Sequence, residues 1–315
     1  MKLKQFLIAV CIGTMFAACS SEETPTQNSG GVPINFTANI QNLVPSVVTR
    51  VADGTDGMVT TSFPENSEIR LGEGNPGTTD SYITNSSSSW TYTSSSDKQY
   101  LPYDKDSKRI VAFFPAPTSS VSGIVNIQGG NVSVSSDQSS IDNYKSSDLL
   151  GAIATVTKDN VESVSLNFKH LCSKVIVNVK NGSGNVSGYT ITMKNIYTTA
   201  AMPLSGGNFT FMTNYFQNNG SVKLGVSSST EGQAAIIIPQ TIAQDVELFE
   251  VTKDDVTYTF TTTESITLKS GYSYTFDLKF ENTEIGFGSV TISNDWGTDP
   301  DKSTPIEGTL SEKTT

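Results

Sequence analysis

The 315-residue sequence is poor in cysteine and histidine, and this shortage excludes several kinds of site. Its three cysteines are Cys11, Cys19 and Cys172, and its single histidine is His170. A zinc site takes three or four Cys, His or carboxylate ligands, so one histidine beside one cysteine is too few. Because the first two cysteines have other fates, argued below, Cys172 has no partner for an intrachain disulfide. The fold must therefore be stabilised by burial of apolar side chains.

Basic residues are scarce as well. The chain has 20 Lys and Arg against 31 Asp and Glu, a formal net charge of −11 at pH 7. Loss of residues 1–18 removes Lys2 and Lys4, which leaves 18 basic against 31 acidic residues and a net charge of −13. So acidic a chain repels nucleic acid, and no basic cluster with interleaved aromatic residues is present. Nucleic acid is therefore excluded as a partner.

Motifs of the common enzyme classes are missing too. No P-loop, G-x-G-x-x-G or G-x-S-x-G segment occurs. His170 and Cys172 are two positions apart and on a strand would face the same side, but no orienting group accompanies them. We interpret them as part of a strand or linker that carries a free thiol. Carboxylates from distant strands could pair for glycoside hydrolysis, although nothing in the sequence indicates a pair. We predict a protein that is not an enzyme, with no catalytic residue and no cofactor.

Two acidic segments are the remaining candidates for a metal site. "DGTDG" at 53–57 and "DWGTDPD" at 295–301 gather carboxylates that could bind calcium weakly. Neither has the ligand order of an EF-hand, which ends in a distant glutamate. We interpret both segments as acidic turns and predict no metal site.

The amino terminus has the pattern of an export signal. Residues 6–16 form an apolar run after two lysines, and this run is shorter than the roughly 20 residues that span a bilayer. Small residues then lead directly to Cys19, which resembles the bacterial lipoprotein signal, in which this cysteine is acylated and begins the mature chain. The alternative is a soluble secreted protein in which Cys19 lies near the cut by chance. We predict a signal peptide over 1–18.

The residues after Cys19 fit attachment to a membrane surface. Two or more acyl chains give a stable anchor, because each buried CH₂ contributes about 0.8 kcal/mol. The "SSEE" at 20–23 resembles the acidic tag that sends lipoproteins to the outer face of some Gram-negative outer membranes. Residues 19–31 read as a flexible tether. We expect an outer-membrane lipoprotein that is exported to the cell surface.

Beyond the tether, apolar and polar residues alternate, which predicts β-strands with one buried face. The pattern is clear at 34–40, 164–168, 175–179, 256–260 and 272–280. Residues 109–115 and 235–239 are apolar throughout, as expected for strands that are buried on both faces or lie at a domain junction. No long amphipathic helix is found, and the Ser-, Gly- and Asn-rich stretches at 75–98 and 117–147 predict long surface loops with short strands.

The length of the chain favours two domains, because about 300 residues exceed one typical hydrophobic core. We predict an all-β fold with one β-sandwich over 32–169 and a second over 170–300, followed by a polar tail over 301–315.

The first predicted strand ends close to an unusual arginine. Within 33–48, the apolar face consists of Ile34, Phe36, Ala38 and Ile40. Thr49 and Arg50 follow, and Arg50 is the first basic residue after Cys19, so a protease that cuts after arginine would act there selectively. The alternative is an ordinary exposed arginine in a loop.

Several motifs in this order together resemble the fimbrillin family of Mfa-like major and minor fimbrial subunits. The resemblance covers roughly 19–300. It is carried by the lipobox, "INFTA" at 34–38, "TR" at 49–50, "DLLGA" at 148–152, "VSLNFKHLCSKVIVNV" at 164–179, "IIIPQ" at 236–240, "GYSYTFDLKF" at 271–280 and "ISNDW" at 292–296.

This resemblance implies a fold and a way of assembly. It implies two transthyretin-like sandwiches, export as a lipoprotein, and proteolysis after Arg50 so that Val51 becomes the first residue. Release of the strand over about 33–48 would open an apolar groove that a strand from the next subunit fills. Loss of an edge strand exposes backbone groups and an apolar slot, and a donated strand restores both.

The carboxyl-terminal end departs from what is expected of a stalk subunit, whose last segment should alternate as a donor strand. Residues 297–315 are polar, with Ile306 and Leu310 as the apolar members beyond Pro305. A tip or accessory subunit, which accepts a strand but need not donate one, fits about as well as a stalk subunit.

A second class of function stays open at this point. An uncut surface lipoprotein could bind a glycan or a protein of a host or bacterial surface through the aromatic-rich segment 90–103. Trp90, Tyr92 and Tyr100 would offer stacking faces, although packing inside a sandwich is the commoner use of such residues.

Overall fold

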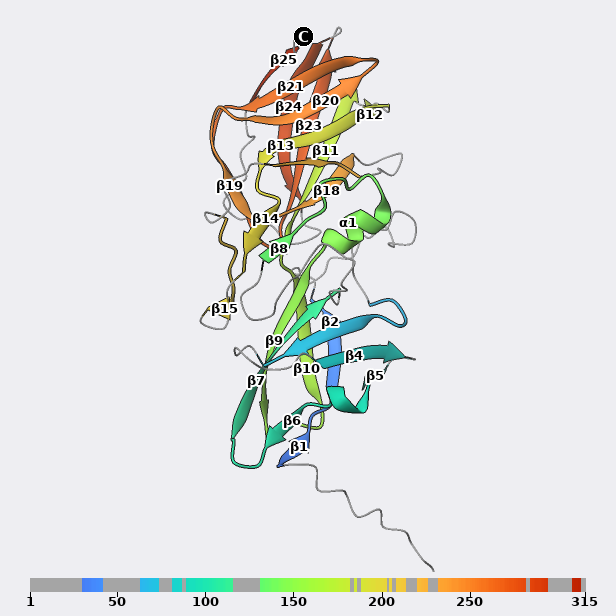
Figure 1. The fold of residues 1–315 in the computed structure, drawn as a ribbon. Helices are drawn as coiled ribbons and strands as arrows, with labels where there is room; N and C mark the ends of the chain where they lie inside the picture. The colour runs from blue at the N-terminus through green and yellow to red at the C-terminus, as the bar shows by residue number, and fades with distance from the viewer. Residues whose placement is uncertain are drawn as a thin grey trace, which may run out of the picture.

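A computed structural model describes residues 30–41, 63–73, 81–86, 89–115, 131–181, 184–185, 188–202, 204–205, 208–213, 220–225, 232–281, 284–293 and 308–312. Cys19, Arg50 and Val51 lie outside these residues, as do the acidic segments 53–57 and 295–301. Within them, the only helices are the 3₁₀-helix η1 (Ser95–Asp97) and α1 (Ile141–Ser147). The molecule is elongated and nearly all β (Figure 1), which confirms the predicted fold class.

One end of the molecule contains a seven-stranded sheet with the order β2-β10-β9-β7-β3-β4-β5. Its first pair, β2 with β10, is parallel, and the other five pairs are antiparallel. A separate short pair joins β1 (Gly31–Pro33) to β6 (Tyr100–Pro102). The seven strands are β2 (Phe36–Ile40), β3 (Glu68–Gly72), β4 (Ser81–Ser86), β5 (Ser89–Tyr92), β7 (Ser107–Phe114), β9 (Leu150–Thr157) and β10 (Val164–His170).

The other end contains two five-stranded sheets (Figure 1). The first consists of β11 (Ser173–Asn181), β12 (Gly184–Asn185), β18 (Gln233–Ile237), β23 (Ser273–Glu281) and β24 (Glu284–Ser293). The second has the order β17-β13-β20-β21-β25, with β13 (Thr190–Ile196), β17 (Gly220–Lys223), β20 (Glu247–Lys253), β21 (Val256–Thr262) and β25 (Gly308–Glu312). Phe249 of β20 packs edge-on against Phe276 of β23 at 4.9 Å, so the two sheets form a sandwich.

Three short strand pairs complete the described structure. They are β8 (Asn131–Ser133) with β14 (Thr199–Ala201), β15 (Leu204–Ser205) with β16 (Asn208–Phe209), and β19 (Gln240–Ile242) with β22 (Ile266–Leu268). Part of the predicted polar tail is a strand, because β25 forms the edge of its sheet and Leu310 stands opposite Phe260.

The buried side chains form two hydrophobic clusters. One lies among the strands of the seven-stranded sheet and the first-strand residues Ile34 and Phe36, and the other fills the sandwich of the opposite end. The second cluster also takes in Phe113 of β7 and Tyr144 of α1, which precede residue 170. The clusters therefore do not separate at one point of the sequence, and the division into two transthyretin-like domains near residue 170 stays a prediction.

Strand alternation follows the predicted pattern in β10 but not in every strand. In β10, Val164, Leu166 and Phe168 are buried while the residues between them are exposed. Ile176 of β11 is buried like Val175 and Val177, and in β21 Thr259 is buried while Val256 and Tyr258 are half-buried, because these strands have other structure over both faces. Residues 235–238 are all buried, as their unbroken apolar pattern predicts. Large exposed hydrophobic residues are limited, in the part of the chain that can be described, to Tyr103 and Ile141.

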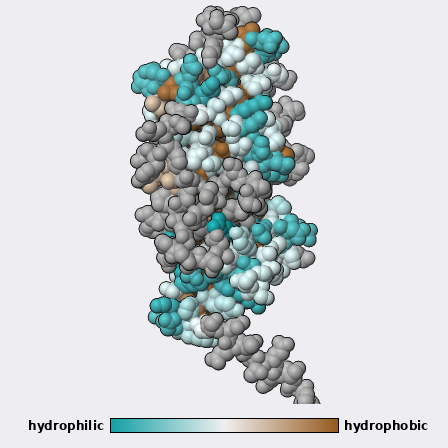
Figure 2. Space-filling view, viewed as in Figure 1, coloured by the Kyte–Doolittle hydropathy of each residue, from teal (hydrophilic) through white to brown (hydrophobic). Residues whose placement is uncertain are grey.

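The coloured face of the molecule shows hydrophobic residues only as small, separated patches (Figure 2). No described helix is long and apolar enough to cross a membrane.

Candidate functional site at the first strand

Residues 31–40, called here the first-strand segment, lie on two different strands in turn. Its first part, β1, pairs antiparallel with β6, and its second part, β2, pairs parallel with β10. The change of partner occurs at Ile34 and Asn35: the Ile34 N–H donates to the Gln99 carbonyl at 3.0 Å, and the Asn35 N–H donates to the Val161 carbonyl at 2.9 Å. We call residues 99–102, Val161 and β10 the strand-binding surface.

The side chains of the first-strand segment alternate between core and solvent. Ile34 is 0% exposed and Phe36 is 5% exposed, and both belong to the hydrophobic cluster of the seven-stranded sheet. Ala38 and Ile40 are half-buried against the same cluster. Burial of a side chain of this size contributes about 1.5–3 kcal/mol to stability. Ile34 and Phe36 therefore supply most of the side-chain free energy that holds the segment in place.

Tyr92, the last residue of β5, also contacts the first-strand segment. Its hydroxyl donates a 2.6 Å hydrogen bond to the carbonyl of Ile34, and its ring meets that of Phe36 edge-on at 6.2 Å. Burial raises the pKa of Tyr92 to about 12, so the hydroxyl keeps the proton that it donates. Because β5 and β2 are the two ends of the seven-stranded sheet, these contacts bring its ends together.

The other two aromatic residues of the predicted ligand platform are half-buried as well. Trp90 packs edge-on against Phe63 at 5.2 Å, and Phe63 in turn contacts Phe114 and Phe168. Tyr100 lies in β6 and pairs with Pro33 of the first-strand segment. Trp90 and Tyr92 thus contact core side chains on at least one side of their rings.

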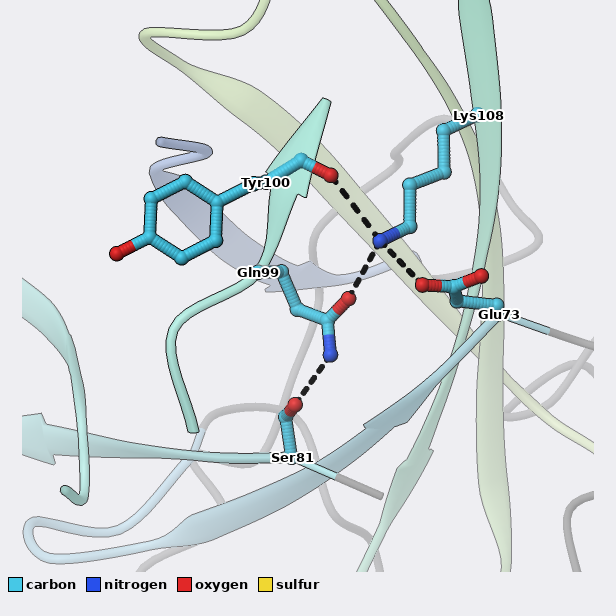
Figure 3. Close-up of polar contacts among 5 residues, drawn as sticks. All are labelled: Glu73, Ser81, Gln99, Tyr100 and Lys108. Atoms are coloured by element: carbon cyan, nitrogen blue, oxygen red, sulfur yellow. Dashed lines mark hydrogen bonds and ion pairs between the residues drawn. The ribbon is translucent and has the colours of Figure 1, made fainter. Parts of the chain in front are cut away.

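A polar cluster holds the β6 part of the strand-binding surface in place (Figure 3). The ammonium group of Lys108 on β7 donates to the Gln99 side chain at 2.7 Å and to the Tyr100 carbonyl at 3.2 Å, and it forms a 2.5 Å ion pair with Glu73. The Gln99 amide in turn donates to the Ser81 hydroxyl of β4. These contacts involve no residue of the first-strand segment, so this part of the surface has its own support.

His170, the last residue of β10, and Cys172 lie beyond residues 164–168, the part of β10 that pairs with β2. His170 Nδ1 lies 2.8 Å from a carboxylate oxygen of Asp148, and both side chains are buried. Asp148 is the orienting partner that sequence reasoning missed; it opens the "DLLGA" motif, which was the one signal available. Cys172 is fully buried and free, and burial, with the nearby Asp148 charge, holds the pKa of its thiol far above the usual range. A thiol that stays protonated is a poor nucleophile.

Among the described residues, no group of three or more His, Cys, Asp or Glu side chains is arranged to hold a metal ion.

Comparison with known proteins agrees with this architecture. Residues 49–296 match the family model described as fimbrillin-like. A proposed cell adhesion protein from Bacteroides ovatus has a similar fold, with a TM-score of 0.59 and 16% identity over 85% of this chain and 99% of that chain. A second from Bacteroides uniformis gives a TM-score of 0.55 and 17% identity over 84% and 98%. A third from Bacteroides thetaiotaomicron gives 0.50 and 16% over 79% and 94%.

Identities this low show likeness of fold alone. No curated protein sequence matches the chain significantly.

Proposed function

Because the chain belongs to the fimbrillin-like family, a family of fimbrial and adhesion proteins of the cell surface, we propose that it is a fimbrial subunit that assembles by strand exchange. The observation that carries this proposal is the position of β2, an edge strand whose first residue, Phe36, is buried together with Ile34 just before it. An edge strand can leave without opening the sheet from within, and a strand of equal shape can replace it.

Release of the first-strand segment would leave a surface that favours a new strand. Backbone groups of Gln99, Val161 and Val164, which now bond to the segment, would lose their partners. A buried polar group without a partner costs about 1–3 kcal/mol, and the places of Ile34 and Phe36 would be open to water. A donated strand removes both costs, whereas the uncut chain carries its own strand and is protected from early assembly.

The proposed processing explains how the segment leaves. Arg50 follows Ile40 by ten positions, so a cut between Arg50 and Val51 separates the whole first-strand segment from the rest of the chain. The segment stays on the side of Cys19, whose acyl chains we propose to hold the precursor in the outer membrane. The cut thereby frees the subunit from its lipid and opens the strand-binding surface in one step. A tip or accessory position remains the role we favour alongside that of a stalk subunit.

The proposal is tested by the amino-terminal residue and mass of the protein taken from its native surface. We expect the form in isolated fimbriae to start at Val51 without an acyl group, and the membrane-bound form to start at an acylated Cys19. The matched variant is Arg50→Lys, which keeps the charge but resists an arginine-specific protease, and it should stay in the membrane fraction.

Recovery of an intact, monomeric chain that begins at Cys19 as the sole surface form would contradict the proposal. That result would favour the uncut lipoprotein that binds a glycan or protein through Trp90, Tyr92 and Tyr100.

A further inference from the structure

We infer that the strand-binding surface selects its donor by a residue pattern, glycine followed by an aliphatic residue three positions on and an aromatic residue five positions on. We also infer that the donor is a segment of another subunit that carries this pattern, and not residues 303–312 of a second copy of this chain. Both statements rest on the proposed function, because they assume that the first-strand segment is released. They are argued from the contacts that the segment makes in the uncut protein.

The first place in the pattern admits no side chain. A Cβ atom built on Gly31 would lie 2.7 Å from the carbonyl oxygen of Leu101 and 2.9 Å from the Cβ atom of Tyr100. Most of this clash is with the backbone of β6, which is fixed nearby by the Lys108 cluster (Figure 3). Gly31 is therefore required by the available space, and a donor with a larger residue at this place would lose the pairing with β6.

The second and third places take large apolar side chains. Ile34 is completely buried, and Phe36 is 5% exposed and packs edge-on against Tyr92. Truncating such residues to alanine leaves a cavity as well as losing the burial of their atoms. Asn35, which lies between them, and Thr37 and Asn39, which follow Phe36, face solvent and place little demand on the donor.

Backbone contacts fix the register in which this pattern is matched. The Ile34 N–H bonds to Gln99 and its carbonyl accepts from Tyr92, so both polar groups of one donor residue are held at one point. A slip by one residue would turn the aliphatic and aromatic side chains to the solvent side. These contacts are independent of sequence, so selectivity comes from the glycine, aliphatic and aromatic places.

The carboxyl-terminal segment of this chain does not match the pattern. It contains a Pro-Ile pair at 305–306, like the Pro-Ile pair at 33–34 of the first-strand segment. In that alignment Ser303 takes the place of Gly31 and Gly308 takes the place of Phe36, so the crowded place receives a side chain and the aromatic place receives none.

The two glycines of this segment give no better alignment. Counting from Gly297, the aliphatic and aromatic places fall on Pro300 and Lys302; counting from Gly308, they fall on Ser311 and Lys313.

The position of this segment in the fold also argues against donation within one molecule. β25 and β1 lie at opposite ends of the molecule (Figure 1), and Gly308–Glu312 already pairs with β21. The donor must therefore come from another molecule, and the mismatch of residues 303–312 indicates that this segment of a second copy does not serve as the donor.

The test uses the full mature chain, cut after Arg50, and fluorescent ten-residue peptides offered in excess. The parent peptide has the sequence of residues 31–40, and its variants carry Gly31→Ala, Phe36→Ala or Asn39→Ala. Anisotropy measures binding, and size-exclusion chromatography confirms that the peptide remains with the chain. We expect Gly31→Ala and Phe36→Ala each to weaken binding at least tenfold, Asn39→Ala to leave it unchanged within twofold, and a peptide of residues 303–312 not to bind.

The outcomes distinguish a failure of strand exchange from a failure of the inferred residue pattern. If the parent peptide does not bind the cut chain, strand exchange itself is wrong and the inference falls with it. If the parent peptide binds but the Gly31→Ala and Phe36→Ala peptides bind equally well, or the 303–312 peptide matches the parent, only the inference is overturned.

Discussion

The hydroxyl of Tyr92 donates a 2.6 Å hydrogen bond to the carbonyl oxygen of Ile34, which joins the end of β5 to the first-strand segment across 58 residues of sequence. This bond, together with the contact between the rings of Tyr92 and Phe36, is made by a residue that stays in the subunit after the proposed cut. Under the proposed strand exchange, Tyr92 would hold the chain's own strand first and a donated strand later.

Substituting Tyr92→Phe should weaken the hold on the first-strand segment while keeping the ring against Phe36. Loss of one such hydrogen bond lowers the free energy of unfolding by about 1 kcal/mol. Amide hydrogen exchange at Ile34 and Asn35 should accelerate more than exchange in β11. The matched control is Tyr103→Phe, at a side chain that is 62% exposed; an equal effect of the two substitutions would contradict the assignment.

Asp148→Ala should destabilise the protein strongly, because it leaves buried His170 without its carboxylate. Leaving one partner of a buried hydrogen bond unsatisfied costs about 1–3 kcal/mol, and the cost should appear as a lower midpoint in urea-induced unfolding. The exposed pair of Asp104 and Lys105, 3.8 Å apart, offers the control: Asp104→Ala should change the free energy of unfolding by less than about 0.5 kcal/mol. Similar losses in the two variants would show that the buried pair is not stabilising.

The thiol of Cys172 should be unreactive in the folded protein and should make stability fall at alkaline pH. Burial raises the pKa of this thiol well above its usual range, so the folded state keeps the thiol protonated where the unfolded state ionises it. The resulting stabilisation is complete below about pH 9 and is lost as pH rises further.

In a Cys19→Ala background, a thiol reagent at pH 8 should label Cys172 only after denaturant is added. The Cys172→Ala variant should lose part of the fall in stability above about pH 9. Rapid labelling of the native protein would contradict the buried, protonated state.

Gly151→Ala should destabilise the packing of β9 against Leu171 and against Phe209 of β16. A Cβ atom at this position would lie 2.7 Å from Leu171 and 2.8 Å from the ring of Phe209. Overpacking of this kind costs about 1–3 kcal/mol. Phe209→Leu removes ring atoms from this contact. In a double-mutant cycle, the loss of unfolding free energy in the double variant should be smaller than the sum of the two single losses by at least about 0.5 kcal/mol. Strict additivity would show that the residues do not compete for one space.

How far the sequence could predict this structure depends on what each pattern encodes. Alternation correctly located the buried faces of β10 and of the first-strand segment, since side chains alternate with a period of two. Alternation does not indicate which strands lie side by side. The parallel pairing of β2 with β10, and the last pair of that register at Ile40, therefore could not be derived from it.

The candidate site was predictable in part for the same reason. The inward face with Ile34 and Phe36 followed from the sequence, but the role of Tyr92 depends on a contact across 58 residues, which no local pattern encodes. Helix α1 was also missed within 117–147. Seven residues are too few to show a helical period, although Ser140, whose hydroxyl accepts from the Asn143 N–H at 3.2 Å, is a typical amino-terminal cap.

The side chain of Gln138 pairs with the backbone at one edge of β18, in the way that a neighbouring strand would. Its side chain is completely buried. The Oε1 atom accepts from the Ile236 N–H at 2.8 Å, and the Nε2 atom donates to the Ile236 carbonyl at 2.8 Å, so one amide satisfies both polar groups of a residue in β18. The Nε2 atom also donates to the Ser135 carbonyl at 3.1 Å, which ties the segment before α1 to the sandwich.

Gln138→Leu keeps the approximate volume but removes all three side-chain hydrogen bonds, and Gln138→Glu keeps an acceptor while placing a carboxylate against the Ile236 carbonyl. We expect each to lower the free energy of unfolding by about 2–4 kcal/mol, because buried backbone groups are left unsatisfied or a charge is buried. Gln41→Leu, at an exposed side chain, is the matched control. Since uncovered strand edges promote pairing between molecules, the Gln138 variants should also self-associate in sedimentation velocity. Full stability and a monomeric state in Gln138→Leu would mean that the edge of β18 is covered by other contacts and that the amide pairing with Ile236 is dispensable.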